Sequence, residues 1–492
     1  MKSLWIAMLC AAMALPGVGG GEPAAPVVEM PAWVEQDSGI TEVGAWSLEL
    51  ADGAVLATSV RTTAEAAPVT RRSYTLADGS RVVMGRAELN GGTAAVETVT
   101  LPEGEGTVRF FDDAGQWVEE PLADGVYRAS AVEIVLEDMA FFCYLPKTYR
   151  EAPRSSLIVQ PAYDGALTVE ETRDGWQVTL TGSAPAGDHV CDFTWAVSDE
   201  PFLDWIRDHW ADDWYNYTQD GAGKWCFDGY YRTTPATYSP TGTGYLYRCP
   251  AAYVVDSMVE AAQARSGARA LATAMVHTMV RNQNGEGFWE TGPESQWLSG
   301  DYGIGPGFYD TRFNSDLAGT LCTFYEAFGG DFVRAALERY ADFYLEFAAA
   351  NHRETAGGGW LVEDYGGDGA NGTMHTSLNH QLAECLVLFR LGAALDRAEL
   401  TELAGRLLQA VEDTGAGWIN AAGDLHYSVS ADGVYSGTDY PYLTYNDLLA
   451  LNTWLRTQTG SDSAVLRTLM TAKRSWMDAN GVTGYDLEGE AP

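Results

Sequence analysis

The feature that most constrains the fold is a unit of two amphipathic helices that recurs four times after residue 250. Each unit ends in a glycine-rich turn and an aromatic ring, as in "GEGFW", "GGGW", "GAGW" and "GVTGY". The rings are Trp289, Trp360, Trp418 and Tyr485, separated by 71, 58 and 67 residues. A repeat of this kind is typical of a helical toroid, where inner and outer helices alternate and the connecting loops build one face. A helical bundle with chance glycines is the alternative, and four recurrences favour the toroid.

Apolar residues at the helical period define the predicted pairs. Their ranges are 252–267 with 269–283, 315–330 with 331–351, 377–392 with 397–414, and 445–460 with 462–480. Another amphipathic segment precedes them at 199–217. We therefore assign residues 200–488 to an (α/α) toroid domain of about four helix pairs.

Residues 28–198 show the period of strands. Alternating polar and apolar runs are broken by Asp-Gly at 52–53, 78–79, 124–125 and 174–175. Asp-Gly between such runs favours tight hairpins, because both residues tolerate a positive φ. The sequence thus predicts a multidomain α and β chain, with an N-terminal antiparallel β region of one or two small sandwiches followed by the toroid.

The first 20 residues have the pattern of a secretory signal peptide, in which a lysine precedes an apolar run and small residues follow. The apolar run is too short to cross a bilayer, so we expect a secreted protein with no membrane association after cleavage. Six cysteines follow this segment, and six can pair in 15 ways. Cys226 and Cys249, which bracket a turn-rich stretch, are the favoured bridge. Cys322 and Cys385 lie in apolar helical stretches and are predicted to be buried thiols.

The formal net charge of −38 disfavours nucleic acid and anionic membranes as partners, because their phosphates would be repelled. The chain has no HExxH, GxSxG, phosphate-loop or dinucleotide-binding pattern, and its seven histidines are scattered. We therefore predict no metal and no cofactor. An exported, aromatic-rich toroid suggests a carbohydrate-active enzyme with a polysaccharide or oligosaccharide substrate, by association with the fold. The oligomeric state stays open, with a homodimer among the possibilities.

Polar side chains gather where loops lead into the predicted helices. Because equivalent loops of a toroid converge on one mouth, we expect a substrate site there. The candidate substrate-binding residues are Tyr309, Asp310, Arg312, Asn314, Glu363, His375, Asn379, Tyr427, Tyr442 and Asn446. Helix capping or an ordinary hydrogen bond is the alternative role for each of them. Arg312 is the candidate for gripping a substrate carboxylate, and a salt bridge to Asp310 or Asp316 is its competing role.

The helical half resembles the carboxy-terminal domain of the D-glucuronyl C5-epimerases over about residues 285–480. The resemblance rests on "GPGFYDTRFNSDLAGTLCTFYEAFGGDFVRAAL", "GWLVEDY", "SLNHQLAECLVLF" and "DYPYLTYNDLLAL", in this order. It implies that Asp364, Tyr365 and Tyr440 occupy the catalytic positions, with Asn379 and Asn446 nearby. The implied reaction is epimerisation at C5 of a uronic acid in a polysaccharide.

Such an epimerase takes a proton from C5 and returns one to the opposite face, so it needs a base, an acid and donors that stabilise the enolate. A phenol tuned by its surroundings can serve as the acid or the base. We therefore predict that Tyr440 and Tyr365 face one another across the mouth, with Asp364 beside Tyr365.

The sequence also departs from the family pattern. Gly423 precedes Asp424 where the family has a tyrosine, and Tyr427 is the nearest replacement. The residues at 314–316 are Asn-Ser-Asp in place of Gln-Gly-Gln. Three alternatives therefore stay open: a polysaccharide lyase, a non-catalytic glycan-binding protein, and a glycoside hydrolase. The hydrolase would draw two carboxylates from Asp310, Asp316, Glu363 and Asp364.

Overall fold

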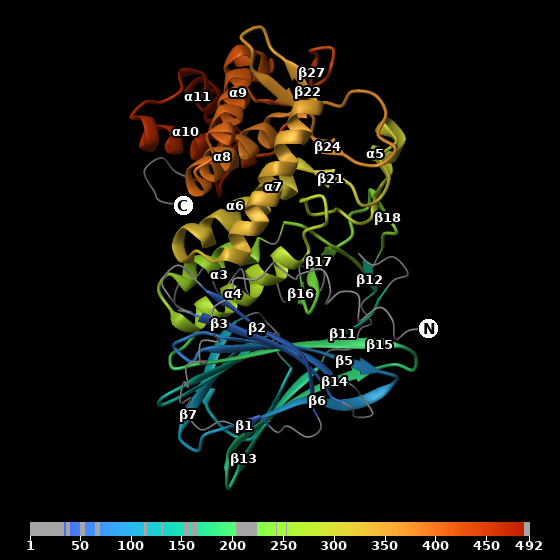
Figure 1. The fold of residues 1–492 in the computed structure, drawn as a ribbon, viewed down its shortest axis with the longest axis vertical. Coiled ribbons are helices and arrows are strands. Elements are labelled where there is room, and N and C mark those ends of the chain that lie inside the picture. Colours follow the sequence, from blue (N-terminus) through green and yellow to red (C-terminus); the bar gives the residue numbers. More distant parts are fainter. Residues whose placement is uncertain are drawn as a thin grey trace, which may run out of the picture.

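The computed structural model describes residues 34–35, 40–49, 55–63, 69–112, 116–128, 131–151, 157–159, 165–202, 224–242, 244–251 and 253–486. The predicted signal peptide lies outside these residues, as does most of the predicted helix at 199–217. A β-sandwich forms one half of the molecule and a layered set of helices forms the other (Figure 1).

The sandwich consists of two antiparallel sheets. The smaller sheet has the order β1 (Val34–Glu35), β6 (Gly92–Leu101), β14 (Gly175–Ala184), β13 (Ala166–Thr172), β9 (Gly125–Tyr127). The larger begins β2 (Ile40–Glu49), β3 (Val55–Thr63), β4 (Val69–Thr75), β5 (Arg81–Leu89), β15 (His189–Ser198), β11 (Ala140–Glu151). From β11 it branches into β10 (Ala131–Leu136), β7 (Gly106–Phe111), β8 (Trp117–Pro121), and into β12 (Leu157–Val159), β19 (Tyr245–Arg248), β17 (Gly229–Thr233), β16 (Lys224–Cys226).

The Asp-Gly pairs behave in different ways. Gly79 and Gly175 have φ of 92° and 117° and lie in the β4–β5 and β13–β14 hairpins, as the sequence predicts. The pair at 124–125 makes no hairpin, because β8 joins the larger sheet and β9 joins the smaller one. The pair at 52–53 lies outside the described residues. A tight turn signal therefore marks a chain reversal without fixing which strand the next segment joins.

A single apolar core fills the space between the two sheets. Val99 and Leu180 of the smaller sheet pack with Val132, Phe141 and Trp195 of the larger one, and all five are buried. Side chains alternate along each strand, so the opposite face of the larger sheet is left to be covered by something else.

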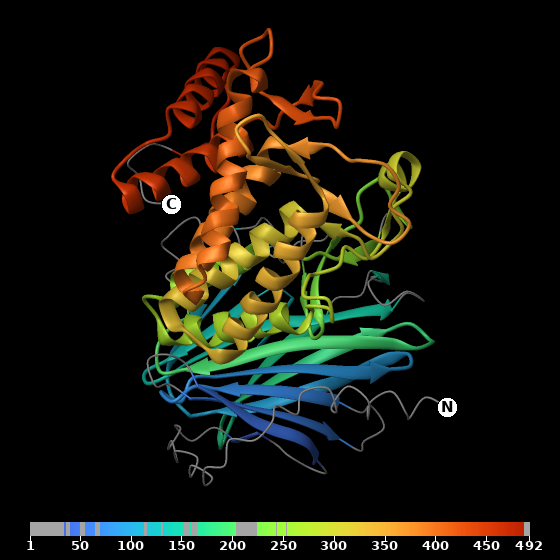
Figure 2. The ribbon, with the colours of Figure 1, turned by 45° about the horizontal axis from the view of Figure 1, so that its top comes forward.

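Helix α4 (Ser266–Arg281) covers that second face, as Figures 1 and 2 show. The Tyr74 hydroxyl on β4 lies 2.9 Å from Nδ1 of His277 on α4. Trp225 on β16 donates from Nε1 to the Thr278 hydroxyl, also on α4, at 3.3 Å. The buried residues of this contact belong to the same apolar cluster as the helical layers, so the two halves share one core.

The larger sheet includes strands from beyond residue 200, where the sequence predicts only helices. The strands β16, β17 and β19 belong to it, and β18 (Tyr238–Ser239) lies in the same segment. The first helix pair accordingly begins at Val254. The predicted Cys226–Cys249 bridge is wrong, because Cys226 packs with Tyr149 while Cys249 packs with Tyr247 in a separate cluster.

The ranges of the four predicted helix pairs all contain helices. Their bounds are α3 (Val254–Ala262), α4, α6 (Thr311–Phe328), α7 (Asp331–Ala350), α8 (Leu378–Leu395), α9 (Ala398–Thr414), α10 (Leu443–Thr459) and α11 (Ala464–Asn480), and a short α5 (Gln296–Tyr302) lies between α4 and α6. Contacts link α3, α6, α8 and α10 in one row and α4, α7, α9 and α11 in a second row. The described helices thus form a two-layered arc in which the rows alternate along the chain. None of them combines the length and apolarity needed to cross a membrane.

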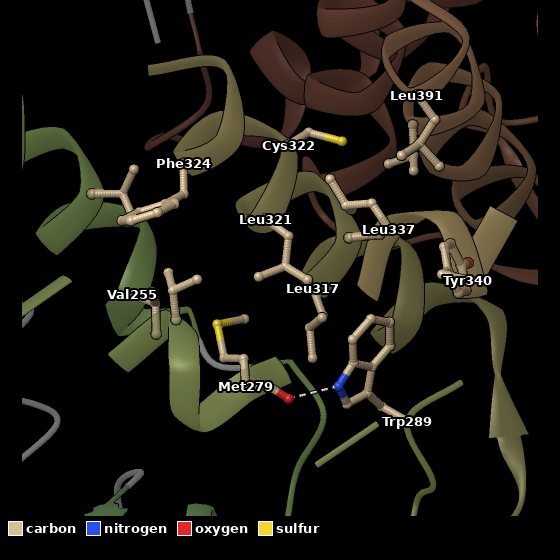
Figure 3. Close-up of a cluster of buried hydrophobic side chains, with 14 of the residues drawn as sticks. Val255, Met279, Trp289, Leu317, Leu321, Cys322, Phe324, Leu337, Tyr340 and Leu391 are labelled. Atoms are coloured by element: carbon tan, nitrogen blue, oxygen red, sulfur yellow. Dashed lines mark hydrogen bonds between the residues drawn. The ribbon is translucent and has the colours of Figure 1, made fainter. Parts of the chain in front are cut away.

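The four repeat-ending rings each lie against the carboxyl end of the second helix of a pair. Trp289 is buried and donates from Nε1 to the carbonyl of Met279 in α4 at 2.8 Å (Figure 3). The others are Trp360, stacked on His352 just after α7 at 3.7 Å, Trp418, which donates to Thr414 of α9 at 2.9 Å, and Tyr485, which donates to Asp478 of α11 at 3.2 Å. The four rings therefore lie at equivalent places in the repeat, each next to the end of the second helix.

Short strands connect the pairs on one face of the arc, visible beside α5 in Figure 1. They are β20 (Glu294–Ser295), β21 (Tyr309–Asp310), β22 (His352–Glu354), β23 (Trp360–Val362), β24 (Tyr365–Gly366), β25 (Thr376–Ser377), β26 (His426–Val429) and β27 (Tyr435–Thr438). The pairings β18–β20, β21–β24 and β25–β26–β27 join loops from different repeats. These pairings bring polar residues at the starts of α6, α8 and α10 together.

Candidate functional site

The site is built where α6, α8 and α10 begin. In the β21–β24 pair, Asp310 lies opposite Tyr365, which puts the entrance of α6 beside the segment that precedes α8. In the β25–β26 pair, Ser377 lies opposite Ser428, so Tyr427 comes to the entrance of α8. The structure thus brings together residues that are more than 100 positions apart in the sequence.

Asp310 is the N-cap of α6. Its Oδ1 accepts a hydrogen bond from the Phe313 amide at 3.0 Å, a typical role for aspartate before a helix. The residue is only 6% exposed, and burial raises its pKa to about 7, with the nearby Asp364 charge adding to the rise. Because this pKa lies near 7, a large fraction of Asp310 keeps its proton at neutral pH and can give it up.

Asp364 lies in the adjacent segment, directly before β24, and its pKa shifts in the opposite direction. It is 1% exposed, its Oδ1 accepts from the Ser377 amide at 2.8 Å, and its carbonyl accepts from the Thr311 amide. Burial alone would raise its pKa, but His380, His375 and the Ser377 contact together hold the pKa below its usual value. Asp364 is therefore an anion throughout the neutral range.

Two histidines flank Asp364. His375 Nε2 lies 3.2 Å from Asp364 Oδ2, and its Nδ1 lies 2.9 Å from the Tyr302 hydroxyl. His380 Nδ1 lies 2.7 Å from the Thr311 hydroxyl. Burial lowers the His380 pKa to about 4, in spite of the nearby Asp364 charge, so the ring is neutral at physiological pH.

The three tyrosines of the predicted mouth differ in exposure. Tyr365 is buried, Tyr427 is half-buried, and Tyr440 is 47% exposed. The ring that faces Tyr440 is Tyr427, in an edge-to-face contact at 5.9 Å. Burial raises the pKa of all three phenols, and the neighbouring aspartates raise it further, so each phenol keeps its proton at neutral pH.

Arg312 forms one of the two salt bridges considered as its alternative role, the one to Asp316. Its Nε lies 2.9 Å from Asp316, its Nη1 lies 2.6 Å from Asp447, and the same Nη1 donates to the Asn379 carbonyl at 3.3 Å. The predicted partner Asp316 is therefore present, whereas Asp310 is replaced by Asp447. A guanidinium held by two carboxylates has little left with which to grip a substrate carboxylate.

Three other candidates have internal partners. Asn314 is fully buried, and its side chain bonds both the amide and the carbonyl of Trp289. Tyr309 is buried among phenylalanines, with its hydroxyl 3.1 Å from that of Tyr340. Asn446 accepts from the Asp486 amide at 3.1 Å and so holds the C-terminal segment. These contacts give each of the three residues a structural role.

The remaining candidates lie at the entrances of α8 and α10. Glu363 is half-buried next to Asp364, and burial raises its pKa. Tyr442 is the N-cap residue of α10 and is 38% exposed. Asn379, in the first turn of α8, is 1% exposed.

Two aromatic residues, Tyr238 and Trp297, belong to the site although nothing in the sequence predicted it. Tyr238 of β18 lies close enough to Asp310 and Tyr440 for their charges to raise its pKa, after burial itself. Trp297 of α5 contacts the rings of Tyr365 and Tyr302 edge-on at 5.4 and 6.1 Å. The pairing of β18 with β20 brings Tyr238 and α5 to the site. Each of these strands is only two residues long, which is too short to be predicted from a sequence pattern.

A buried lysine supports the exposed tyrosine from behind. Lys473 of α11 is fully buried, with Nζ 2.6 Å from Asp424, 2.7 Å from Asp439 and 2.7 Å from the Tyr440 carbonyl. Thr444 donates to the other oxygen of Asp439 at 2.6 Å. The two aspartates that the sequence places among the polar loop residues thus serve to hold the loop that carries Tyr440.

Within the described ranges, no group of three or more His, Cys, Asp or Glu side chains is arranged to hold a metal ion.

Comparison with known proteins gives limited likeness. No family model matches the chain, and no protein with a curated description matches it. Among solved structures, a glycoside hydrolase family 76 mannosidase from Bacteroides thetaiotaomicron is 13% identical, with 45% of this chain and 58% of that one covered and a TM-score of 0.34. A D-mannose isomerase is 12% identical over 46% and 59%, with a TM-score of 0.34. A family 76 glycoside hydrolase from a bovine Bacteroides thetaiotaomicron strain is 10% identical over 80% and 75%, at 0.37.

This chain thus spans 58% and 59% of the first two of these proteins. At TM-scores this low, the likeness carries no argument, and the function is inferred from the site itself.

Proposed function

We propose that the protein is a carbohydrate-active enzyme that transfers protons through two aspartates, and that its reaction is glycoside hydrolysis. The observation that carries the proposal is the opposite behaviour of Asp310 and Asp364. The pKa of Asp310 is raised to about 7 and that of Asp364 is held below its usual value, although the two residues lie in neighbouring segments joined by the β21–β24 pair. Two carboxyl groups whose pKa values are pushed apart are the usual sign of an acid and a base with separate tasks.

In this proposal Asp310 protonates the glycosidic oxygen as the bond to C1 breaks. Asp364, as a carboxylate, either activates a water molecule or attacks C1 itself, depending on the spacing of the two groups around the bound sugar. The half-buried rings of Trp297 and Tyr427 and the exposed ring of Tyr440 lie in the same region as this pair and suit the C–H faces of a sugar. Export from the cytoplasm, as the first 20 residues suggest, is part of the same proposal.

The second candidate is epimerisation at C5, and the contact between Tyr427 and Tyr440 favours it. Both phenols are protonated, and the charge of Asp364 contributes to the raised pKa of each. In this alternative Tyr440 would be the acid and Asp364 the base. A uronate substrate would need a cation, and Arg312 is already held by two carboxylates. This is why hydrolysis is placed first.

One experiment separates the reactions. The protein is incubated in deuterated water with neutral polysaccharides (mannan, starch and β-glucan) and with heparosan. New reducing ends indicate hydrolysis, deuterium at C5 without cleavage indicates epimerisation, and a new double bond indicates elimination. We expect new reducing ends from a neutral polymer.

Site variants complete the test. Asp310→Asn keeps an oxygen for the helix cap but has no proton to give, so we expect turnover to fall by about 10²- to 10⁴-fold. Asp432→Asn is the control, because Asp432 is exposed in the β26–β27 turn. Equal activity of both variants would contradict the assignment of Asp310 as the acid.

A further inference from the structure

The entrance of α8 contains buried polar atoms that have no hydrogen-bond partner. These include Asp364 Oδ2, Asn379 Oδ1 and the hydroxyl of the N-cap residue Ser377, and none of the three residues is more than 1% exposed. His375 Nε2 lies 3.2 Å from Asp364 Oδ2 but lacks the alignment of a hydrogen bond, and it too is unsatisfied. Nearly all buried polar atoms in folded proteins are paired, so unpaired atoms from one helix entrance need an explanation.

The orphaned oxygens of Asp364 and Asn379 are both hydrogen-bond acceptors. An ionised carboxylate has only acceptor sites, and the orphaned atom of Asn379 is its carbonyl oxygen. The partner that satisfies them must bring donors. The alternative of a metal ion is disfavoured, because the described part of the chain has no group of three or more acidic, histidine or cysteine side chains placed to hold one.

The charged groups around the entrance point to an uncharged partner. Asp364 is itself an anion, and Glu363 directly precedes it. The nearest guanidinium, that of Arg312, is occupied by Asp316 and Asp447. A carboxylate on the ligand would be repelled by the charge of Asp364 and could not bond the orphaned oxygens of Asp364 and Asn379.

We propose that this entrance binds the hydroxyl groups of an uncharged sugar, one hydroxyl donating to Asp364 Oδ2 and another to Asn379 Oδ1. The inference deepens the proposed function by naming the substrate class as a neutral glycan, and it rests on that function only for the reaction that follows binding. Asn379 is then a specificity-determining residue, because its unpaired carbonyl oxygen can accept a hydrogen bond from a hydroxyl but not from a carboxylate.

The test measures binding without turnover. Calorimetric titration uses the full-length Asp310→Asn protein, in buffer containing EDTA, with mannotriose, maltotriose, cellotriose and a heparosan tetrasaccharide as ligands. We expect at least one neutral trisaccharide to bind and the heparosan tetrasaccharide to bind at least tenfold more weakly. Tighter binding of heparosan, no binding of any neutral trisaccharide at millimolar concentration, or loss of binding caused by EDTA would each overturn the proposal.

A pair of asparagine variants locates the site. Asn379→Leu, added to Asp310→Asn, should weaken the neutral ligand by about tenfold, as expected for a lost hydrogen bond. Asn446→Leu is the matched control, because Asn446 is also in the first turn of a helix but bonds the Asp486 amide. Unchanged affinity in Asn379→Leu, or an equal loss in both variants, would overturn the site.

Stability separates a binding role from a structural one. Since Asn379 Oδ1 has no partner, Asn379→Leu should leave the melting temperature of the ligand-free protein unchanged or raise it, and Asn379→Ala provides a smaller replacement if leucine does not fit. A lower melting temperature for both would show that the amide supports the fold instead. If neutral sugars bind as expected but no turnover is found with any polymer, the proposed reaction fails while the binding site stands.

Discussion

Replacement of Asp310 by asparagine should make the protein more stable at neutral pH while it removes activity. In the unfolded chain the carboxyl group ionises near 3.8, and in the folded protein it ionises at about 7. Between these values the folded state holds a proton that the unfolded state has released, so the free energy of unfolding falls as pH rises through this window. Above pH 7 the buried group is ionised in both states, and the full cost of about 4 kcal/mol is present.

Asparagine has no charge to bury and still caps α6, so the variant escapes this loss. The same two pKa values place the cost at about 2 kcal/mol at pH 5 and about 4 kcal/mol at pH 8. We therefore expect the stability gain of Asp310→Asn over the wild type to grow by about 2–3 kcal/mol between pH 5 and pH 8. Urea unfolding at both pH values, followed by tryptophan fluorescence, measures it. A gain that does not change with pH would refute the buried, raised carboxyl group.

Three further predictions follow from the site and the repeats. Hydrolytic activity should be lost above about pH 7, where Asp310 gives up its proton, and should persist on the acid side until the pH falls below the usual carboxyl range, because the lowered pKa of Asp364 keeps it ionised; a rate that still rises at pH 9 would contradict this assignment. Lys473→Met should reduce the free energy of unfolding by about 3–5 kcal/mol, because it leaves the buried carboxylates of Asp424 and Asp439 without their counter-ion. A urea midpoint equal to that of the wild type would show that these ion pairs do not stabilise the fold. Gly359→Ala should cost about 1–3 kcal/mol, because its Cβ would meet the backbone of Ala410 in α9; calorimetry showing an unchanged melting temperature would contradict that close approach.

The sequence by itself determined the helices and the regions that carry polar groups. The helical period is local, so each apolar stripe predicts its own helix whatever the stripe later packs against. The ends of the repeats were readable for the same reason, since a ring such as Trp289 or Trp418 bonds back to a helix only a few residues away. The loop entrances to α6, α8 and α10 were also predicted as the place of the site, and Asp364, Tyr365 and Tyr440 all lie there.

Only the tertiary structure decided which polar groups are available. Asn314 and Arg312 look like ligand-binding residues in the sequence, but Trp289, Asp316 and Asp447 satisfy them, and these partners depend on how distant segments pack. The sequence did not predict Lys473, Tyr238 or Trp297 as part of the site, because each lies in another helix or strand and reaches the site only through tertiary packing. The charge state of Asp310 also belongs to the tertiary level, because burial sets the cost of ionisation, and a sequence does not state how much water a side chain will lose.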